Sequence, residues 1–339
     1  MRSSTVLLLS LRSVAHETIK NLVLAGIGRL IIMDDGVVTP EDLGGGFLFR
    51  EEDGAVGKLR TEASSPQIAS LNPLVALTAV PTLAPFIRNS QTAGAKVDSE
   101  EEMVEYLQRE KVDVVVCCDM TSEEVLRIDA AARNAGVMFY AAGSFGFYGY
   151  VFADLGDSYE YVFTPPSNPS NPPPSLQKKL SRYSPFSRVL DRSQWHLPHT
   201  SGAKGGSPYR GLTRSVTKDR TPGPTLGLLA LWELEKVHGR LPLPEDSEEM
   251  RDVAEGSRRD LGVNEKALPG VEGGMIEHLT QHAAHFFPPT LAILGGLLAQ
   301  DVLRALSKKD KPIVNLLVLD SMGGTANVSR WAMDDAVDA

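Results

Sequence analysis

The chain has 339 residues, of which 42% are hydrophobic and 23% are charged. This composition is typical of a soluble globular protein, and the length favours roughly two domains. A net charge of -9 argues against general affinity for nucleic acid or anionic membranes. The two cysteines are adjacent, at Cys117 and Cys118, which excludes a disulfide framework and a CxxC zinc or redox site. The apolar run at 291–306 is interrupted by an amide and two charged residues, so we expect no membrane span.

The first 155 residues alternate short β-branched runs with amphipathic stretches. This alternation predicts βαβ units and hence an α/β fold with a Rossmann-like, doubly wound, mostly parallel sheet. We expect the N-cap of the fourth helix at Ser122. The expected strands are 5–9, 29–34, 75–80, 112–118 and 137–142, and the expected helices are 14–25, 59–71, 100–109 and 122–135.

The middle of the chain differs in composition from both ends. Residues 164–174 are nearly all Pro, Ser and Asn, and residues 177–220 carry ten Lys or Arg against two acids. We interpret this part as a solvated, flexible insertion with few apolar anchors, dispensable for folding. A nuclear targeting signal or a patch for an acidic partner is the sharper alternative, and we expect the segment to assist nuclear import.

Regular patterns return in the last third of the chain. We expect helices at 225–238, ended by Gly239, and at 274–286. A helix that is apolar on all sides follows Pro288, which predicts burial, and its Gly295 and Gly296 predict that another element packs against their backbone. Segments 314–320 and 326–331 then predict an antiparallel strand pair with a turn between them.

The turn after the first strand is where nucleotide chemistry is expected. In a nucleotide-binding sheet this turn is rich in glycine, because only glycine lets the backbone approach phosphates at a helix N-terminus. Residues 10–15 hold no glycine, so we expect no working dinucleotide site. Asp34 and Asp119 follow the second and fourth strands, where an acid could bind ribose hydroxyls, although acids are also common in such loops.

The other candidate residues favour structural roles. Glycines at 143, 146 and 149 permit a sharp bend or a close backbone contact more readily than a phosphate loop. His278, His282 and His285 could share one helical face at a spacing that suits zinc, but the HExxH form is absent and we expect ordinary packing and no metal. The paired cysteines end an apolar strand, where we expect burial and no nucleophile.

Several segments together resemble the ubiquitin-like-modifier activating enzymes of the ThiF/MoeB superfamily. They are DDGVVTPEDLGGGFLF, VGKLRTEA, LNP, VDVVVCCDM, AAGSFGFYGYVFADLG and PPTLAILGGLLAQDVLRAL, the last being the most specific. The resemblance covers residues 5–163 and 225–330. In length and in its small helical insertion, the chain is most similar to the smaller, non-catalytic subunits of SUMO-activating heterodimers.

In this family the active half uses ATP and magnesium to adenylate the C-terminal glycine of the modifier. Residue by residue, the resemblance implies a degenerate remnant of that site. Asp34 matches the ribose acid, Asp119 matches the metal-side aspartate, and Arg60 stands where the active half has a lysine. Gly45 takes the position of an arginine that contacts ATP. We expect no catalytic residues and no cofactor bound by this chain alone, with ATP and Mg in the partner subunit's site.

The resemblance implies a regulatory, non-adenylating subunit of a heterodimeric SUMO-activating enzyme, needed for adenylation and thioester formation on its homologous catalytic partner. The interface would include Leu43, Phe47, Phe49 and Gly146. SUMO would be contacted through the complex, with no nucleic acid or membrane partner. The location would be nuclear, with the cytoplasm as an additional location. The alternatives are the equivalent subunit for another modifier, a degenerate Rossmann-fold oxidoreductase, and a scaffold with no part in activation.

The resemblance also guides the expected domain organisation. The family's small subunits carry an arginine-containing stretch before the first strand, where this sequence has four residues, so we expect a truncated gene model, with a short natural form as the alternative. The expected parts are 1–156 (first part of a pseudo-adenylation domain), 157–224 (Pro-rich and basic insertion), 225–287 (helical insertion), 288–331 (C-terminal part of the adenylation domain) and 332–339 (acidic tail).

Overall fold

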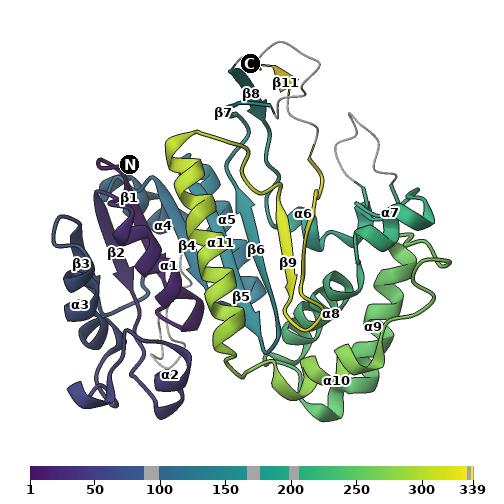
Figure 1. The fold of residues 1–339 in the computed structure, drawn as a ribbon, viewed down its shortest axis with the longest axis horizontal. Helices are drawn as coiled ribbons and strands as arrows, with labels where there is room; N and C mark the ends of the chain where they lie inside the picture. Colours follow the sequence, from purple (N-terminus) through teal and green to yellow (C-terminus); the bar gives the residue numbers. More distant parts are fainter. Residues whose placement is uncertain (88–98, 166–175, 198–205, 334–336, 339) are drawn as a thin grey trace.

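The computed structural model describes residues 1–87, 99–165, 176–197, 206–333 and 337–338. A main sheet forms its centre, with helices on both faces (Figure 1). The main strands are β1 (Thr5–Leu9), β2 (Arg29–Met33), β3 (Ala76–Val80), β4 (Val114–Cys118), β5 (Met138–Phe145), β6 (Tyr148–Asp154), β9 (Leu316–Asp320) and β10 (Thr325–Ser329). A small sheet contains β7 (Tyr159–Phe163), β8 (Gln177–Ser181) and β11 (Val337–Asp338).

The helices lie between and after these strands. They are α1 (Ser13–Leu24), α2 (Pro40–Gly45), α3 (Arg60–Leu71), α4 (Glu100–Arg109), α5 (Ser122–Ala135), α6 (Ser187–Leu190), α7 (Arg214–Asp219), α8 (Gly223–His238), α9 (Ser247–Asp260), α10 (Gly273–His282) and α11 (Pro288–Ser307). Short 3-10 turns are η1 (Glu51–Asp53), η2 (Arg192–Gln194) and η3 (Pro244–Asp246). The boundaries of β1, α4 and α5 are those that the sequence predicted, whereas the N-cap of α5 is Thr121 and not Ser122, because the Thr121 hydroxyl accepts from the Glu124 amide.

The strand order is β10-β9-β6-β5-β4-β1-β2-β3. The strands β5, β4, β1, β2 and β3 are parallel to one another. The pairs β5–β6, β6–β9 and β9–β10 are antiparallel. This confirms the Rossmann-like, mostly parallel sheet and the C-terminal antiparallel strand pair. The parallel order also brings the carboxyl ends of β1, β2 and β4 together at one edge, which places the candidate site there.

Alternate side chains of the parallel strands feed two separate cores. Leu7 and Val115 join the core under α4, α5 and α8, whereas Leu8 and Val116 join the core under α1 and α11. A strand that is apolar on both faces is what a sheet covered by helices on both sides requires. The molecule is therefore a helix–sheet–helix sandwich, with α9 and α10 beside it (Figure 1).

The insertion is more ordered than its composition predicted. In the described part of residues 177–220, the side chains of Tyr183, Phe186, Trp195 and Tyr209 are buried, and the Phe186 ring packs against Trp232 of α8. The expectation of few apolar anchors is wrong here, because a few large aromatic rings bury as much apolar area as many small residues. Residues 166–175 and 198–205, where part of the flexibility was expected, lie outside the described residues.

Helix α11 joins the C-terminal part of the chain to the first βα unit. A Cβ on Gly295 would lie 2.5 Å from the Glu17 Cβ of α1, which confirms the expected close approach. Gly296 has open space instead, and Ile293 is 45% exposed, so the prediction of burial on all sides is wrong. Among the described residues, α11 is also the one helix whose length and apolar composition would suit a membrane span, and half of that window is buried in the protein.

The β5–β6 hairpin explains the three glycines spaced by three. Gly146 adopts a positive φ of 61° in the two-residue turn between Phe145 and Tyr148. A Cβ on Gly149 would lie 2.3 Å from the Leu294 side chain of α11. The bend and the close contact that the spacing predicted are both confirmed.

Candidate functional site: the carboxyl ends of β1, β2 and β4

Two backbone donors of the turn between β1 and α1 are bonded to carboxylates. The amide of Leu11 donates to Asp34 Oδ2 over 2.6 Å, and the amide of Val14 donates to Asp119 Oδ2 over 3.2 Å. Ser10 has a positive φ of 70°, a backbone conformation that glycine adopts far more readily than other residues. In a phosphate-binding turn these amides would point at the ligand, but here both are bonded within the chain.

Asp34 is enclosed by further partners. Its Oδ1 accepts from the amide of Gly36 over 2.7 Å, and Arg60 Nη1 lies 3.7 Å from the same oxygen. Burial raises the pKa of the Asp34 carboxyl, and the bond from Leu11 and the charge of Arg60 oppose that rise. The acid that could have bound a ribose therefore stabilises the turn after its own strand.

Arg60 is bound mainly to a second buried carboxylate. Its Nη2 and Nε atoms lie 3.0 and 3.2 Å from Asp42 Oδ2, and its side chain is 14% exposed. Asp42 also accepts from the amide of Thr39 and completes the capping box of α2. This network joins α2, α3 and the end of β2, and it holds the Arg60 guanidinium between two acids.

Asp119 is equally occupied on the other side of the turn. Its Oδ1 accepts from the amide and the hydroxyl of Ser144 over 2.9 and 3.4 Å. Burial raises the pKa of its carboxyl, and the bonds from Ser144 and Val14 lower it in part. With both oxygens accepting from the protein, Asp119 joins β4, β5 and α1.

His16 fills the space over the start of α1. Its Nδ1 accepts from the amide of Leu48 over 3.2 Å, so its Nε2 carries the proton and donates to the carbonyl of Leu11, 3.3 Å away. Burial lowers the pKa of His16 to about 4, and the ring is therefore neutral at physiological pH. Its ring centroid lies 4.5 Å from that of Phe49.

The glycine run of α2 is explained by this packing. A Cβ on Gly46 would lie 1.9 Å from His16 Nδ1, and a Cβ on Gly45 would lie 2.8 Å from the Phe286 ring. Gly45, which stands where the family resemblance places an ATP-binding arginine, thus packs closely against the Phe286 ring. Of the residues expected at the partner interface, Phe49 is 4% exposed in this chain, whereas Phe47 is 41% exposed and Leu43 is half-buried.

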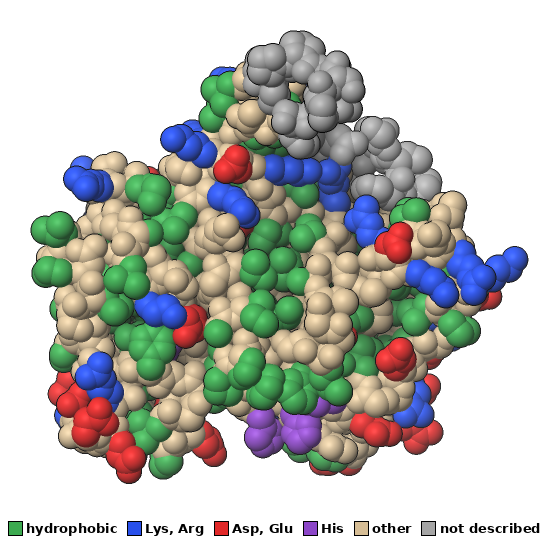
Figure 2. All heavy atoms as spheres, in the orientation of Figure 1, with side chains coloured by type: hydrophobic (Ala, Val, Ile, Leu, Met, Phe, Trp, Pro, Cys, Tyr) green, Lys and Arg blue, Asp and Glu red, His purple; other side chains and the backbone are tan. Residues whose placement is uncertain are grey.

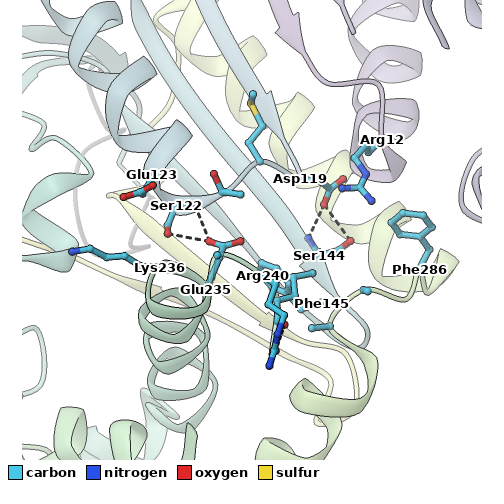
Figure 3. Close-up of a pocket in the computed structure, with 16 residues that line it drawn as sticks. Arg12, Asp119, Ser122, Glu123, Ser144, Phe145, Glu235, Lys236, Arg240 and Phe286 are labelled. Atoms are coloured by element: carbon cyan, nitrogen blue, oxygen red, sulfur yellow. Dashed lines mark hydrogen bonds between the residues drawn. The ribbon is translucent and has the colours of Figure 1, made fainter. Parts of the chain in front are cut away.

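A cavity of about 280 Å³ remains open beside Asp119 (Figure 3). It extends from the start of α5 to the end of α8 and the segment after α10. Glu235 of α8 lines it and accepts from the amide and hydroxyl of Ser122, over 2.9 and 3.0 Å. Arg12 stands above the Phe286 ring at 5.8 Å. Acidic and basic side chains alternate around the cavity, so it offers no single charge to a ligand.

The remaining candidates have structural surroundings. His278 Nε2 accepts from the amide of Phe147, which fixes the hairpin turn beside Gly146, and its pKa is lowered by burial and by the neighbouring His282. Among the described residues, the one group with ligand atoms close enough for a metal is instead His238, Asp246 and Glu249. Its members are already bonded, because Arg240 binds Asp246 over 2.6 Å and His238 binds Glu249 over 3.1 Å.

The two cysteines are fully buried, one in each core. Burial raises the pKa of both thiols well above the ordinary value. A nucleophilic cysteine needs access and a lowered pKa. Neither cysteine of this chain has either property.

Sequence reasoning did not find His16, Asp42 or Glu235. His16 lies on the apolar face of α1, where a polar residue is the available signal, but its partners come from segments that sequence cannot place. Asp42 and Arg60 are eighteen residues apart, and the bond of Glu235 to Ser122 spans more than a hundred. These contacts depend on tertiary structure.

Comparison with known proteins adds relatives of the same length. The model of the ThiF family matches residues 1–336. SUMO-activating enzyme subunit 1 of Homo sapiens is 27% identical, over 97% of this chain and 89% of that protein. The DNA damage tolerance protein RHC31 of Saccharomyces cerevisiae is 28% identical, over 95% of this chain and 89% of that protein. The rat SUMO-activating enzyme subunit 1 is 26% identical over 97% of this chain. The chain belongs to the ThiF family.

Proposed function

We propose that this chain is the regulatory, non-adenylating subunit of a heterodimeric SUMO-activating enzyme. It would assemble with a second, homologous subunit that holds ATP and magnesium and forms the thioester with the modifier. Support for SUMO comes from its relatives, which are SUMO-activating enzyme subunits. Support for the non-adenylating role comes from the chain's own site.

The observation that carries the non-adenylating role is the pair of bonds from Leu11 and Val14 to Asp34 and Asp119. A nucleotide at this turn would need those amides, and it would have to break two bonds in a buried setting, each worth about 1.5–3 kcal/mol when a charged group accepts. His16 and Gly46 also fill the adjoining space. The residues present do not fit ATP, so no step of adenylation is assigned to them.

The absence of an accessible thiol supports the same role. A thioester needs a thiolate that the modifier's C-terminus can reach. Both cysteines in the sequence are buried with raised pKa values. We therefore place the thioester on the partner subunit.

Calorimetric titration of the purified chain with Mg-ATP tests the proposal. We expect no saturable binding tighter than about 10 µM, which corresponds to roughly 7 kcal/mol. The matched control is the same titration of the chain after assembly with the larger ThiF-family subunit of its organism, where one nucleotide site should appear. A tight site on the isolated chain would contradict the non-adenylating assignment.

The choice of modifier and the location in the cell have separate tests. Thioester formation by the reconstituted pair should require SUMO. If the pair forms a thioester with another ubiquitin-like modifier instead, the chain would be the equivalent subunit for that modifier.

We also propose a nuclear location, which the excess of Lys and Arg in residues 177–220 supports. Imaging of a fluorescent fusion checks it, and a purely cytosolic signal would contradict it.

A further inference from the structure

The small sheet lies at the opposite end of the molecule from the candidate site (Figure 1). Its strand β7 pairs antiparallel with β8, and β8 pairs antiparallel with β11. The other edge of β7 is bonded to the segment after α11, because the amide of Val162 donates to the carbonyl of Lys308 over 3.0 Å. The chain itself therefore covers both edges of the small sheet.

The cover on the β8 edge is short. Strand β11 has two residues, with Val337 opposite Leu180 and Asp338 opposite Lys179, whereas β8 has five. An edge strand presents unpaired amides and carbonyls that can bind another extended chain. Pairing over two residues is marginal, since even complete two-stranded hairpins are barely stable in water. Within the described residues, the outer edge of β8 is therefore paired over less than half of its length.

The surroundings of this edge are basic. Lys179 and Arg330 both act on Tyr161 of β7, lowering its pKa against the rise that burial causes. Arg330 and burial together lower the pKa of Lys311. Figure 2 shows several Lys and Arg side chains gathered at this end of the molecule. By contrast, the sequence of residues 333–338 holds three aspartates and no basic residue.

A large cavity continues from the edge. It has a volume of about 600 Å³, and its lining includes Leu180 of β8, three arginines and Asp157, which pairs with one of them, Arg133. The other two arginines are Arg182 and Arg188, and Ala332 lines the cavity just before the tail. The Ser184 hydroxyl donates to the carbonyl of Ala332 and fixes the chain where it enters the cavity. The cavity could take side chains of a strand longer than β11.

We propose that the edge of β8 is a strand-addition site for an extended, acidic segment of a partner protein. The C-terminal residues 337–338 occupy this site within the chain and compete with the partner. This inference is independent of the adenylation site and goes beyond the proposed function. A tethered tail reaches an effective concentration in the millimolar range, so an outside peptide has to displace it, and removal of the tail should make binding measurable.

The test uses a fluorescein-labelled peptide of residues 332–339 and fluorescence anisotropy. We expect the peptide to bind a variant lacking residues 334–339 at least about tenfold more tightly than it binds the full chain. In that variant, Lys179→Glu should weaken binding about fivefold, while Lys58→Glu, at an exposed lysine near α3, should leave it unchanged. A peptide with asparagine for each aspartate should bind more weakly.

A second variant keeps the full length of the chain. Val337→Pro removes one of the two backbone amides of β11 and disfavours pairing in a strand, so the peptide should bind this variant more tightly than the unaltered chain. Equal affinity for the full chain and both tail variants would overturn the proposal, as would no binding to any of them. Equal binding of the asparagine peptide would overturn the acidic character of the partner.

Discussion

The two sides of the turn after β1 differ in how completely the chain fills them. On the β2 side, Asp34, Asp42 and Arg60 form a closed ionic network, and Gly46 at the end of α2 packs against His16. On the β4 side, Asp119 has its own bonds, but a cavity of about 280 Å³ stays open between α5 and α8. The closed side depends on tight packing and buried charge, so changes there should cost far more than changes on the open side.

The largest expected effect is the loss of Arg60. Arg60→Met keeps most of the side-chain volume but leaves the Asp42 and Asp34 carboxylates buried without their cation. Breaking a buried ion pair in this way costs about 3–5 kcal/mol. Urea unfolding would measure the loss. Arg109→Met is the matched control, because Arg109 is 66% exposed beside Glu110 and its loss should cost less than about 1 kcal/mol. Equal costs would remove the distinction between the two sides of the turn.

Acid should weaken the closed side through His16. Its pKa falls from 6.5 to about 4 on folding because burial disfavours the charged ring. The contribution of the neutral ring to stability is therefore complete above pH 6.5 and is lost as the pH falls toward 4, by about 3 kcal/mol at most.

The measurement is the difference in unfolding free energy between the unaltered chain and His16→Asn, whose side-chain oxygen can still accept from Leu48. Buried carboxyls such as Asp34 and Asp119 have raised pKa values and favour the folded state as the pH falls, and the subtraction cancels their effect. A difference that does not change between pH 7 and 4 would contradict the buried, neutral ring.

The glycine run gives a contrast between neighbours. Gly46→Ala would place a Cβ 1.9 Å from His16 Nδ1, and overpacking of this kind costs about 1–3 kcal/mol. Gly44→Ala meets no atom within 4 Å and should be neutral or slightly stabilising, since alanine favours helix. Thermal unfolding of both variants measures the difference in stability. An unchanged melting temperature for Gly46→Ala would mean that Gly46 does not pack tightly against His16.

The smallest effect is expected on the open side. Glu235→Gln retains an oxygen that can accept from Ser122 and removes a carboxyl whose pKa burial has already raised. We expect a loss of about 1 kcal/mol or less. Glu233→Gln on the same helix is the control and should change nothing measurable. A loss near that of Arg60→Met would show that the open side is as tightly built as the closed one.

The sequence predicted the sheet better than it predicted the site. Hydrophobic periodicity and runs of β-branched residues are local signals, so they predicted the bounds of β1 and α4 directly. The aromatic rings of the insertion were missed because Phe186 and Trp195 meet their partners in α8 and at Trp331, far along the chain. Local composition cannot reveal such contacts.

The site shows the same limit in another form. Asp34 and Asp119 were identified as candidates for nucleotide chemistry, and the structure places both beside the turn. A carboxylate at a strand end accepts equally well from a ribose, a metal-bound water or a backbone amide. Only the positions of the Leu11 and Val14 amides decide between these roles, and those depend on the path of a turn without glycine.

The bonds from Leu11 and Val14 to these two aspartates mean that conversion of this turn to a nucleotide-binding turn would need several simultaneous changes. Glycines introduced at residues 10–15 would clear space, yet the amides would stay bonded to Asp34 and Asp119. Replacing either aspartate would free one donor but leave the other bonded to its carboxylate. A single substitution in this turn would therefore not expose both amides to a ligand.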